Sequence, residues 1–361
     1  MDSLLELEQK LKETTNLYIY GAGIIAYGVQ KAIRKIWGTE ITAYIVTYLK
    51  SDEQAFMGRP LLSICDLAMQ KTRGFILVAT PSEYHNEIAR HIKQKTNMEF
   101  MLVGERLQYA LLGHYYKDNF GMLLLDDLSR DISNKLNRRF AVYMAKSSRD
   151  RKLCQPIKIP KYIQPIQAGT ALDIESLEGI LHDNEGDNIS ERNRDYSELT
   201  VTYWVWKHCQ SDYLGICHYR RMLDLSRDDY EAVAQADVDV VLPLPYLCQG
   251  DASFQYKRYV SEVDMNLLFS VLTVEERRDL REAISLPYIY NHNLLICKHN
   301  VFKRYNEYLF SILQRVDAIE QKDGLRNDRH LGYLGEILTS AFFTQHAGEL
   351  KIVHAPELWL V

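Results

Sequence analysis

The sequence predicts an α/β fold made of two domains, and two observations support this prediction. Short apolar runs alternate with amphipathic stretches over roughly the first hundred residues, which is the pattern of strand–helix units around a parallel sheet. A stretch at 105–139 interrupts this alternation, and a new apolar run begins after it. With 361 residues, the chain is long enough for two ordinary domains. We place them at 1–135 and 136–361.

The composition excludes several broad classes of protein. The net charge is −5 and the pI is near 6.1, which argues against nucleic acid as a partner. No run of 18 apolar residues is present, so no transmembrane helix is expected. The start, MDSLLELEQKLKETT, lacks the basic and apolar regions of a signal peptide. Six scattered cysteines are typical of reduced thiols. The expected location is the cytoplasm, with peripheral attachment to the inner face of the membrane left open.

The first domain is expected to alternate strands and helices in the order of a Rossmann-like fold. Its expected elements are a helix at 1–15, a strand at 17–20, a helix after the glycine turn, a strand at 40–47, a helix at 59–71, a strand at 74–80, a helix at 82–95 and a strand at 99–104.

The glycine turn of this domain, with Gly21, Gly23 and the small Ala26, resembles the first turn of a dinucleotide-binding fold. However, Thr47 and Tyr48 stand where an acidic residue should hold the ribose, and Asp52 and Glu53 come several residues late. NAD is therefore an improbable cofactor. Two interpretations remain open: a bound nucleotide, or an accessory domain that positions the rest of the chain or binds a partner.

The joint at 105–139 is expected to be helical, with a turn at 118–121. It contains no Pro-, Gly- or Ser-rich linker, so the two domains are expected to pack together.

The second domain is expected to gather polar residues at the carboxyl ends of its strands. The expected order is a strand at 139–146, a strand that ends at 167–169, a polar loop, a helix at 196–207 with Asp195 or Ser197 as its cap, and a strand that ends in His218–Arg221. Ligands of open α/β sheets bind at that edge. The question is why a buried strand should end with an imidazole and two guanidinium groups.

The block GDNISERNRDYSELTVTYWVWKHCQSDYLGICHYRR, residues 186–221, resembles the core of a family of bacterial capsule and exopolysaccharide glycosyltransferases, long known only as a domain of unknown function. The resemblance extends over about 138–345 and includes QAG and GYLGE. The domain also resembles the wider GT-A class. In addition, YGAGIIAYG, GRPLLS and VAT resemble N-terminal domains fused to bacterial polysaccharide-building enzymes.

This resemblance implies a hexosyltransferase. The donor would be a nucleotide sugar, with a UDP-sugar as the default and UDP-galactofuranose as a narrower hypothesis. The acceptor would be a growing capsule or exopolysaccharide glycan, in free or lipid-linked form. His218, Tyr219 and Arg220 align with the Asp-x-Asp metal site of GT-A enzymes. Arg220 and Arg221 are therefore expected to neutralise the leaving diphosphate directly, with His218 as a further donor, so a divalent metal is doubtful.

Other candidates follow from the same alignment. The expected catalytic base is a carboxylate near the last long helix, either Asp328 or Glu336, with Glu336 preferred. The expected donor-binding residues are Gln167, Gly169, Asp187, Asn188, Arg192, Asn193, Glu198 and Tyr219. The expected acceptor-side residues are Asn291, His292, Asn293 and Arg329.

Several of these residues have plainer alternatives. Asp187 and Asn188 suit loop hydrogen bonding, Glu198 suits a first helical turn, and the arginines could pair with surface acids at 224, 228 and 229. The literal D-x-D at 237–239 precedes an apolar run, so we interpret it as a pair that opens a strand and not as a metal site.

Two other functions remain as alternatives. A NAD(P)-dependent nucleotide-sugar oxidoreductase or epimerase would use the glycine turn, but no Tyr-x-x-x-Lys pair follows that turn within its domain. A non-catalytic scaffold that binds nucleotide sugars is the alternative outside enzymes.

Overall fold

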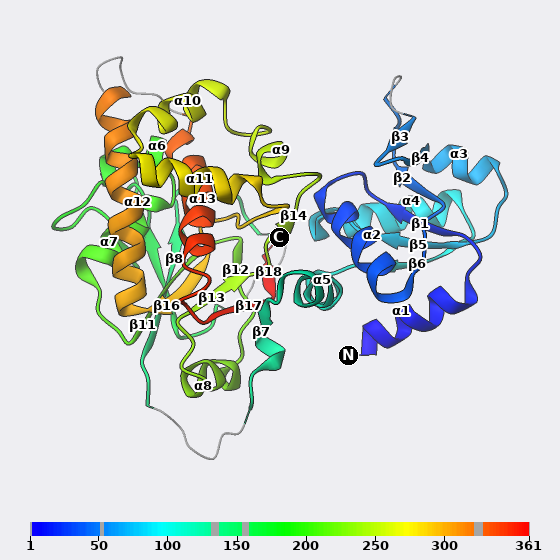
Figure 1. The fold of residues 1–361 in the computed structure, drawn as a ribbon, viewed down its shortest axis with the longest axis horizontal. Helices are drawn as coiled ribbons and strands as arrows, with labels where there is room; N and C mark the ends of the chain where they lie inside the picture. The colour runs from blue at the N-terminus through cyan, green and yellow to red at the C-terminus, as the bar shows by residue number, and fades with distance from the viewer. Residues whose placement is uncertain (1, 51–53, 131–136, 154–158, 321–327, 361) are drawn as a thin grey trace. The chain divides into compact units, whose positions relative to one another are not determined.

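The computed structural model describes residues 2–50, 54–130, 137–153, 159–320 and 328–360. The chain forms two compact units (Figure 1). Unit 1 comprises the residues up to Met122 together with Tyr246–Gln249, and unit 2 comprises Leu123–Pro245 and Gly250–Leu360. The predicted boundary between residues 135 and 136 lies outside the described residues. None of the described helices is long and apolar enough to cross a membrane.

Unit 1 has an α/β architecture around one sheet. Its elements are α1 (Asp2–Glu13), β1 (Leu17–Tyr20), α2 (Ile24–Trp37), β2 (Ala43–Val46), β3 (Ala55–Phe56), β4 (Arg59–Ser63), α3 (Ile64–Met69), β5 (Phe75–Val78), η1 (Ser82–Tyr84), α4 (His85–Lys95), β6 (Glu99–Leu102), α5 (Glu105–Phe120) and β14 (Tyr246–Leu247). The strand order is β3-β4-β2-β1-β5-β6. All neighbours are parallel except β3 and β4. The Rossmann-like prediction for this part agrees with that topology.

One expected helix of unit 1, at 59–71, begins as a strand. Residues 59–63 form β4, in which Leu61 is buried and pairs with Tyr44 of β2. The helix begins only at Ile64, because Ser63 and Asp66 form a capping box there. The predicted helix at 59–71 is therefore wrong in its first third.

Gly21 is required by the packing of the sheet. Its φ is +125°, and a Cβ atom at this position would lie 2.6 Å from the carbonyl oxygen of Ala79, which follows β5. Only glycine fits such a backbone without strain. The glycine is therefore explained by the approach of β1 to β5, whether or not a nucleotide binds. Asp52 and Glu53 lie outside the described residues.

Unit 2 contains a larger mixed sheet. Its elements are β7 (Leu123–Leu124), η2 (Leu125–Asp127), β8 (Phe140–Lys146), β9 (Ile163–Gln167), η3 (Thr170–Leu172), β10 (Leu181–His182), η4 (Ser190–Arg192), α6 (Asn193–Tyr196), α7 (Leu199–His208), β11 (Tyr213–His218), β12 (Arg221–Leu223), α8 (Arg227–Gln235), β13 (Val240–Pro243), α9 (Ala252–Tyr256), α10 (Glu262–Val271), α11 (Val274–Ser285), β15 (Tyr288–Ile289), β16 (Leu295–Lys298), α12 (His299–Glu320), α13 (His330–Gln345), β17 (Ile352–Ala355) and β18 (Glu357–Trp359).

The main path of this sheet is β10-β9-β8-β11-β16-β13-β17-β7. Strand β16 runs antiparallel to β11 and β13, and the remaining neighbours whose register is defined are parallel. Strand β12 pairs with β11 on one side and with β18 on the other. The carboxyl ends of β8, β9 and β11 therefore meet at one edge.

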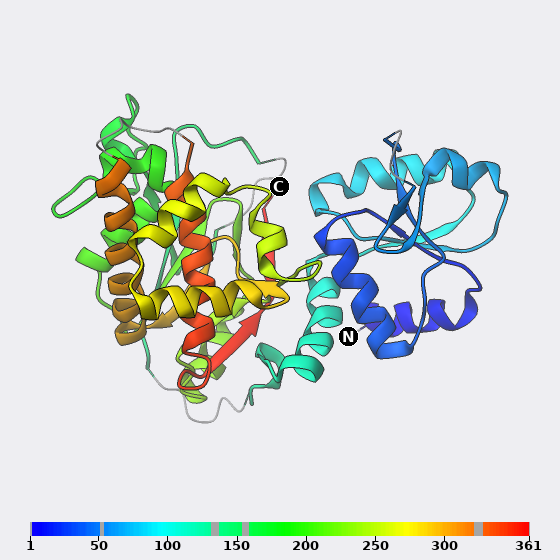
Figure 2. The same cartoon turned by 45° about the horizontal axis from the view of Figure 1, so that its top comes forward.

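Alternation along β11 decides which side chains face the site. Tyr213 and Cys217 join a core cluster that includes Tyr230 and Val233 of α8. Because successive side chains point to opposite faces, His218 projects to the other face of the sheet. Helices α7 and α12 pack on strands β8 and β11, and α12 contacts α13 beside it. Figure 2 shows α12 in orange and α13 in red-orange over the sheet.

The predicted helix at 196–207 is interrupted. Ser197 has a φ of +53°, and it separates α6 from α7. The N-cap residue of α7 is Glu198, without a side-chain capping bond, so the predicted caps Asp195 and Ser197 are wrong. Asp195 instead accepts hydrogen bonds from Arg192.

The D-x-D at 237–239 has the structural role that the sequence predicts. Both carboxylates lie 2.8 Å from Nζ of Lys298, directly before β13 begins. At the joint, α5 continues to Phe120 and Gly121 caps it in the left-handed conformation. The predicted turn at 118–121 is therefore wrong at 118–120, which are helical, and the chain leaves the helix only at Gly121.

Candidate functional site

The polar end of β11 is a tight hairpin. His218 pairs with Arg221 across β11 and β12, so Tyr219 and Arg220 form the turn between them. Strand β18 continues the pairing, and the backbone N–H of Leu360 donates to the carbonyl of Arg220 at 2.7 Å. The chain reverses here, and this explains how four polar residues can follow a buried strand.

A first cavity of about 530 Å³ opens at this edge of the sheet. It is lined by Ala145, Lys146, Ser147, Arg149, Asp150, Arg151, Ala168, Gly169, Leu172, Asp173, Asn193, Arg194, Ser197, Glu198, His218, Tyr219, Arg220 and Arg329. Six of these residues are Lys or Arg and three are Asp or Glu. The excess of cations favours an anionic ligand, since guanidinium groups match phosphate oxygens in bidentate fashion.

A second cavity of about 400 Å³ lies next to the first. It is lined by Ser197, Glu198, His218, Arg220, Arg221, Gln255, Tyr259, Asn291, His292, Arg329, Gly332, Tyr333 and Glu336. Ser197, Glu198, His218, Arg220 and Arg329 line both cavities. Two ligands could therefore meet at this shared wall.

The shared wall contains a close acid–base pair. Burial lowers the pKa of His218 to about 4, and the positive charges of Arg221 and Arg220 add to this effect against the opposing influence of Glu198. Burial by itself would raise the pKa of Glu198, but His218 and a hydrogen bond from Asn293 lower it. We therefore expect an ionised Glu198 beside a neutral His218 at pH 7.

Glu336 of α13 lines the second cavity and differs from Glu198 in its electrostatics. Burial raises its pKa to about 7, although His292 acts in the opposite direction. Its Oε1 accepts a hydrogen bond from the backbone N–H of His292 at 3.0 Å. A carboxylate with this pKa can accept a proton near neutral pH, as a general base requires.

The acceptor-side prediction at 291–293 corresponds to a turn that reaches both glutamates. Asn293 donates to Oε1 of Glu198 at 2.9 Å. Nδ1 of His292 lies 2.9 Å from Oε1 of Glu357 on β18. Asn291 and His292 line the second cavity, and Oδ1 of Asn291 is buried without a partner among the described residues.

Backbone strain is concentrated around the shared wall. Ser197, His292, Asn293 and Arg329 all have positive φ angles although none is glycine. Each such residue costs on the order of 1–3 kcal/mol and persists only where the surrounding structure holds it. Strain of this kind is common at binding sites, and three of the four residues line the second cavity.

Gly169 and Asn193 fit together in the first cavity. Gly169 has a φ of +69°, and a Cβ atom there would lie 2.6 Å from Cγ of Asn193. The backbone N–H of Gly169 donates to the buried Asp183. Tyr219 lines the same cavity, and its hydroxyl accepts from the backbone N–H of Arg151 at 3.4 Å. Gly169, Asn193 and Tyr219, which were predicted to bind the donor, therefore all line the first cavity.

Four predicted donor-binding residues instead hold the surrounding loops. The amide of Gln167 bonds Asp173 and the backbone of Glu175 and Leu177. Asn188 donates to the carbonyls of Asn184 and Gly186. Asp187 accepts a hydrogen bond from Tyr203 and forms an ion pair with Lys207. Arg192 forms ion pairs with Asp195 and Asp317. None of the four lines either cavity.

The structure also distinguishes the two residues predicted as the catalytic base. Glu336 lines a cavity, whereas Asp328 is about half exposed (49%) and lies 2.8 Å from Nδ1 of His330. Of the surface acids considered as partners for the arginines, Asp229 caps α8 and pairs with Arg130.

The prediction missed the loop that follows β8. Lys146, Arg149, Asp150 and Arg151 line the first cavity, and burial raises the pKa of Asp150 to about 6. The run AKSSRDRK begins as β8 ends, so the rule applied to β11 also identifies it. By contrast, Gln255 of α9, Tyr333 of α13 and Tyr259 in the turn after α9 line the second cavity without a distinguishing sequence pattern.

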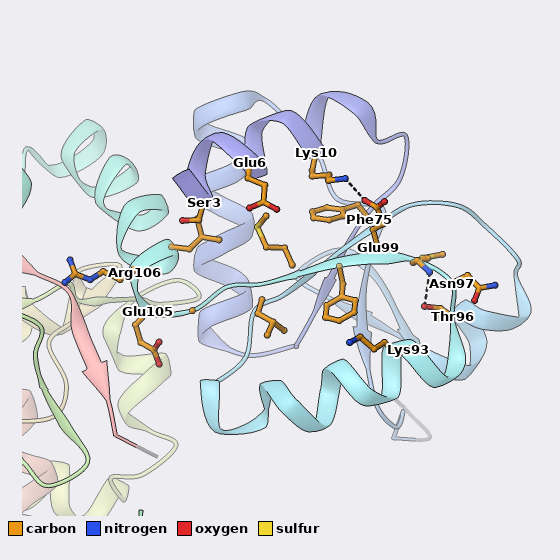
Figure 3. Close-up of a pocket in the computed structure, with 16 residues that line it drawn as sticks. Ser3, Glu6, Lys10, Phe75, Lys93, Thr96, Asn97, Glu99, Glu105 and Arg106 are labelled. Atoms are coloured by element: carbon orange, nitrogen blue, oxygen red, sulfur yellow. Dashed lines mark hydrogen bonds and ion pairs between the residues drawn. The ribbon is translucent and has the colours of Figure 1, made fainter. Parts of the chain in front are cut away.

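A groove of about 1040 Å³ is present in unit 1 (Figure 3). It extends along β6, between α1 and α4, and Lys10 pairs with Glu99 across it. Neither Gly21 nor Gly23 lines this groove. It mixes apolar side chains with charges of both signs, so it lacks the cationic character of the cavities in unit 2.

No group of three or more His, Cys, Asp or Glu side chains suited to a metal ion occurs within the described parts of the chain.

Comparisons with known proteins identify a matching family and a solved structure of similar fold. The model of a domain of unknown function (DUF4422) matches residues 152–347. The apo structure of WbbM, a bifunctional glycosyltransferase, is similar with a TM-score of 0.52 and 22% identity. That similarity covers 61% of this chain and 45% of WbbM, so the chain corresponds to less than half of that protein. No curated protein sequence matches the chain. Because the family model covers more than half of its 361 residues, the chain belongs to the DUF4422 family.

Proposed function

We propose that unit 2 is a glycosyltransferase that moves a sugar from a nucleotide-sugar donor to a glycan acceptor. The observation that carries this proposal is the pair of adjoining cavities. One has a cationic lining suited to a diphosphate, the other contains a carboxyl with a pKa of about 7, and five residues line both. The fold shared with the glycosyltransferase WbbM supports the same reaction class.

In this proposal the donor diphosphate occupies the first cavity. Arg220 and Arg329 lie on the wall where the leaving group would separate from the sugar, and Arg149, Arg151 and Arg194 line the remaining surface. Fixed guanidinium groups would stabilise the negative charge that develops on the diphosphate. His218, being neutral, would act as a hydrogen-bond donor and not as a charge.

The acceptor hydroxyl would lie in the second cavity beside Glu336. Its oxygen attacks the anomeric carbon, the bond from that carbon to the diphosphate breaks, and Glu336 takes the hydroxyl proton. This single displacement inverts the anomeric configuration. Asn293 would keep Glu198 fixed at the shared wall through its 2.9 Å hydrogen bond.

The finer parts of the proposal follow from the family resemblance. We propose a UDP-sugar as donor, with UDP-galactofuranose as one candidate, and a capsule or exopolysaccharide glycan as acceptor. Arginines would replace a divalent metal at the diphosphate. Unit 1 would serve as an accessory unit, because the packing of β1 against β5 already explains Gly21.

A product-release screen tests the function directly. The purified protein is incubated with UDP-, GDP- and CMP-sugars, and free nucleotide is measured with and without oligosaccharide acceptors. The proposal expects release from one class of nucleotide sugar and faster release with an acceptor. Oxidation or reduction of NAD(H) with a nucleotide sugar, and no nucleotide release, would favour an oxidoreductase. Binding without turnover of any donor would favour a scaffold protein.

A further inference from the structure

The two arginines of the β11–β12 hairpin do not share one role. Among the described residues, Arg220 lines both cavities, whereas Arg221 lines only the second. The reversal of the chain at 219–220 separates them, because Arg221 already belongs to β12 and pairs with Trp359 of β18. The guanidinium of Arg221 therefore belongs to the acceptor side.

Arg221 is held in place by the carboxyl-terminal strand. Its guanidinium carbon lies 4.3 Å from the centroid of the Trp359 ring, which is a close cation–π contact. Its Nε is 3.9 Å from Oε1 of Glu357, at the outer limit of an ion pair. The same oxygen of Glu357 lies 2.9 Å from Nδ1 of His292. The orientation of Arg221 is therefore fixed, but its carboxylate partner Glu357 is distant and also contacts His292.

The arrangement leaves one edge of the guanidinium for a ligand. The ring face of Trp359 covers one side, and Nε faces Glu357. The terminal Nη atoms make no hydrogen bond to another described residue. A planar guanidinium fixed in this way presents two parallel N–H donors, which match the two oxygens of a carboxylate or a phosphate.

The charges in the second cavity favour an anion as well. Arg220, Arg221 and Arg329 line it, against Glu198 and Glu336. Even when both carboxyl groups are ionised, three guanidinium groups face two carboxylates, so the lining keeps a net positive charge when the acceptor binds.

We propose that Arg221 binds an oxyanion carried by the acceptor, such as the carboxylate of a uronic acid or a phosphate on the acceptor glycan. This inference rests on the proposed function in one respect, namely that the second cavity receives the acceptor. It makes Arg221 a residue that determines acceptor specificity, separate from the arginines that would bind the donor diphosphate.

The test measures acceptor binding without turnover. Protein saturated with UDP is titrated, by ligand-observed NMR, with methyl β-glucuronide, glucose 1-phosphate and the neutral methyl β-glucoside. The wild type should bind at least one anionic probe roughly tenfold or more tightly than the neutral probe, a difference of about 1.4 kcal/mol. Whether the glucuronide or the phosphate binds more tightly identifies the oxyanion.

Two variants make the test specific. Arg221→Gln should remove the preference for the anionic probe and leave the affinity for UDP unchanged. Arg149→Gln removes a cation that lines the first cavity and not the second, so it should weaken UDP binding. When the UDP concentration is raised until this variant is saturated, it should still prefer the anionic probe. Arg221→Lys should retain part of the preference, because an ammonium lacks the planar fork.

Three results would overturn the inference: equal affinity of the wild type for charged and neutral probes, no binding of any probe, or a preference that survives in folded Arg221→Gln. If Arg221→Gln lowers the melting temperature and leaves the preference intact, the residue is structural. Failure of the proposed function is distinguishable, because it appears as absence of nucleotide release from UDP-, GDP- and CMP-sugars alike in the wild type. In that event the anion preference is measured on nucleotide-free protein.

Discussion

The carboxyl group of Glu336 is expected to change its protonation state near neutral pH. Burial raises its pKa to about 7, and its Oε1 accepts from the backbone of His292. If it is the base, the rate of transfer should fall as the pH drops below about 7, because the protonated carboxyl cannot accept a proton.

Glu336→Gln tests this role at the level of one residue. The variant should lose about 10²–10⁴ in kcat and should lose the pH dependence near 7. Initial rates measured between about pH 5.5 and 9 give both values, with Asp328→Asn as the control that should behave like the wild type. A flat pH profile in the wild type, or full activity of the glutamine variant, would exclude Glu336 as the base.

Arg220 supports a second prediction at this scale, since it lines both cavities. Arg220→Ala should lower turnover by roughly 10²–10³, the usual effect of removing one fixed donor from developing charge. Arg220→Lys should recover only part of this loss. Chelators should leave the wild-type rate unchanged. Loss of activity on chelation, restored by manganese, would mean that a metal and not Arg220 neutralises the diphosphate.

At the scale of elements, the segment from η4 to α6 is a scaffold for the cavities. Arg192 connects Asp195 of α6 with Asp317 of α12, and their side chains are 18%, 3% and 11% exposed respectively. Its removal would leave two carboxylates largely buried without their cation. Uncompensated buried charges are among the strongest destabilising changes.

Arg192→Met should therefore lower the free energy of unfolding by about 3–5 kcal/mol, as measured by urea denaturation. The affinity of the folded fraction for UDP should change little, because Arg192 lines neither cavity. Asp187→Ala is the matched control: its side chain is 61% exposed and loses an ion pair with Lys207 and a hydrogen bond from Tyr203, so the cost should be about 1–2 kcal/mol, below that of Arg192→Met. A stable Arg192→Met protein that no longer binds UDP would reverse this interpretation.

Elements of unit 2 show what the sequence could and could not predict. Apolar periodicity identified β11 and the strand that follows the D-x-D, because burial imposes that periodicity. It did not identify the break at Ser197, because no glycine or proline marks the positive φ angle there. The sequence also predicted that Gln167 and Arg192 bind the donor, but neither lines a cavity of the candidate site. It could not tell that their partners would be Asp173 and Asp317, because such partners depend on the tertiary fold.

At the scale of the whole molecule, each unit has its own sheet, and both cavities of the candidate site lie within unit 2. The glycine turn of unit 1 was the most recognisable motif of the N-terminal sequence, yet its first glycine is explained by packing. Short motifs are ambiguous in this way, because sheet packing and phosphate binding both require glycine.

Gly21→Val should therefore act on stability and not on transfer. The clash with Ala79 and the positive φ should lower the melting temperature, whereas the affinity of the folded protein for UDP should be unchanged. Gly23→Ala is the control, because a Cβ atom at that position meets nothing within 4 Å. Loss of UDP affinity in a folded Gly21→Val protein would show that the two units are coupled.

Thermal unfolding with a panel of nucleotides tests the assignment of the site to unit 2. A ligand at about 100 times its Kd stabilises the native state by about 2.7 kcal/mol, so the shift is measurable even for weak binders. We expect stabilisation by UDP and little effect of NAD(H). The shift should shrink in Arg149→Gln, because Arg149 lines the cationic first cavity, and should persist in Lys93→Gln, whose lysine lines the groove of unit 1. If NAD(H) alone stabilises the protein, or if Lys93→Gln abolishes the shift and Arg149→Gln does not, the nucleotide binds in unit 1 and the transferase proposal fails.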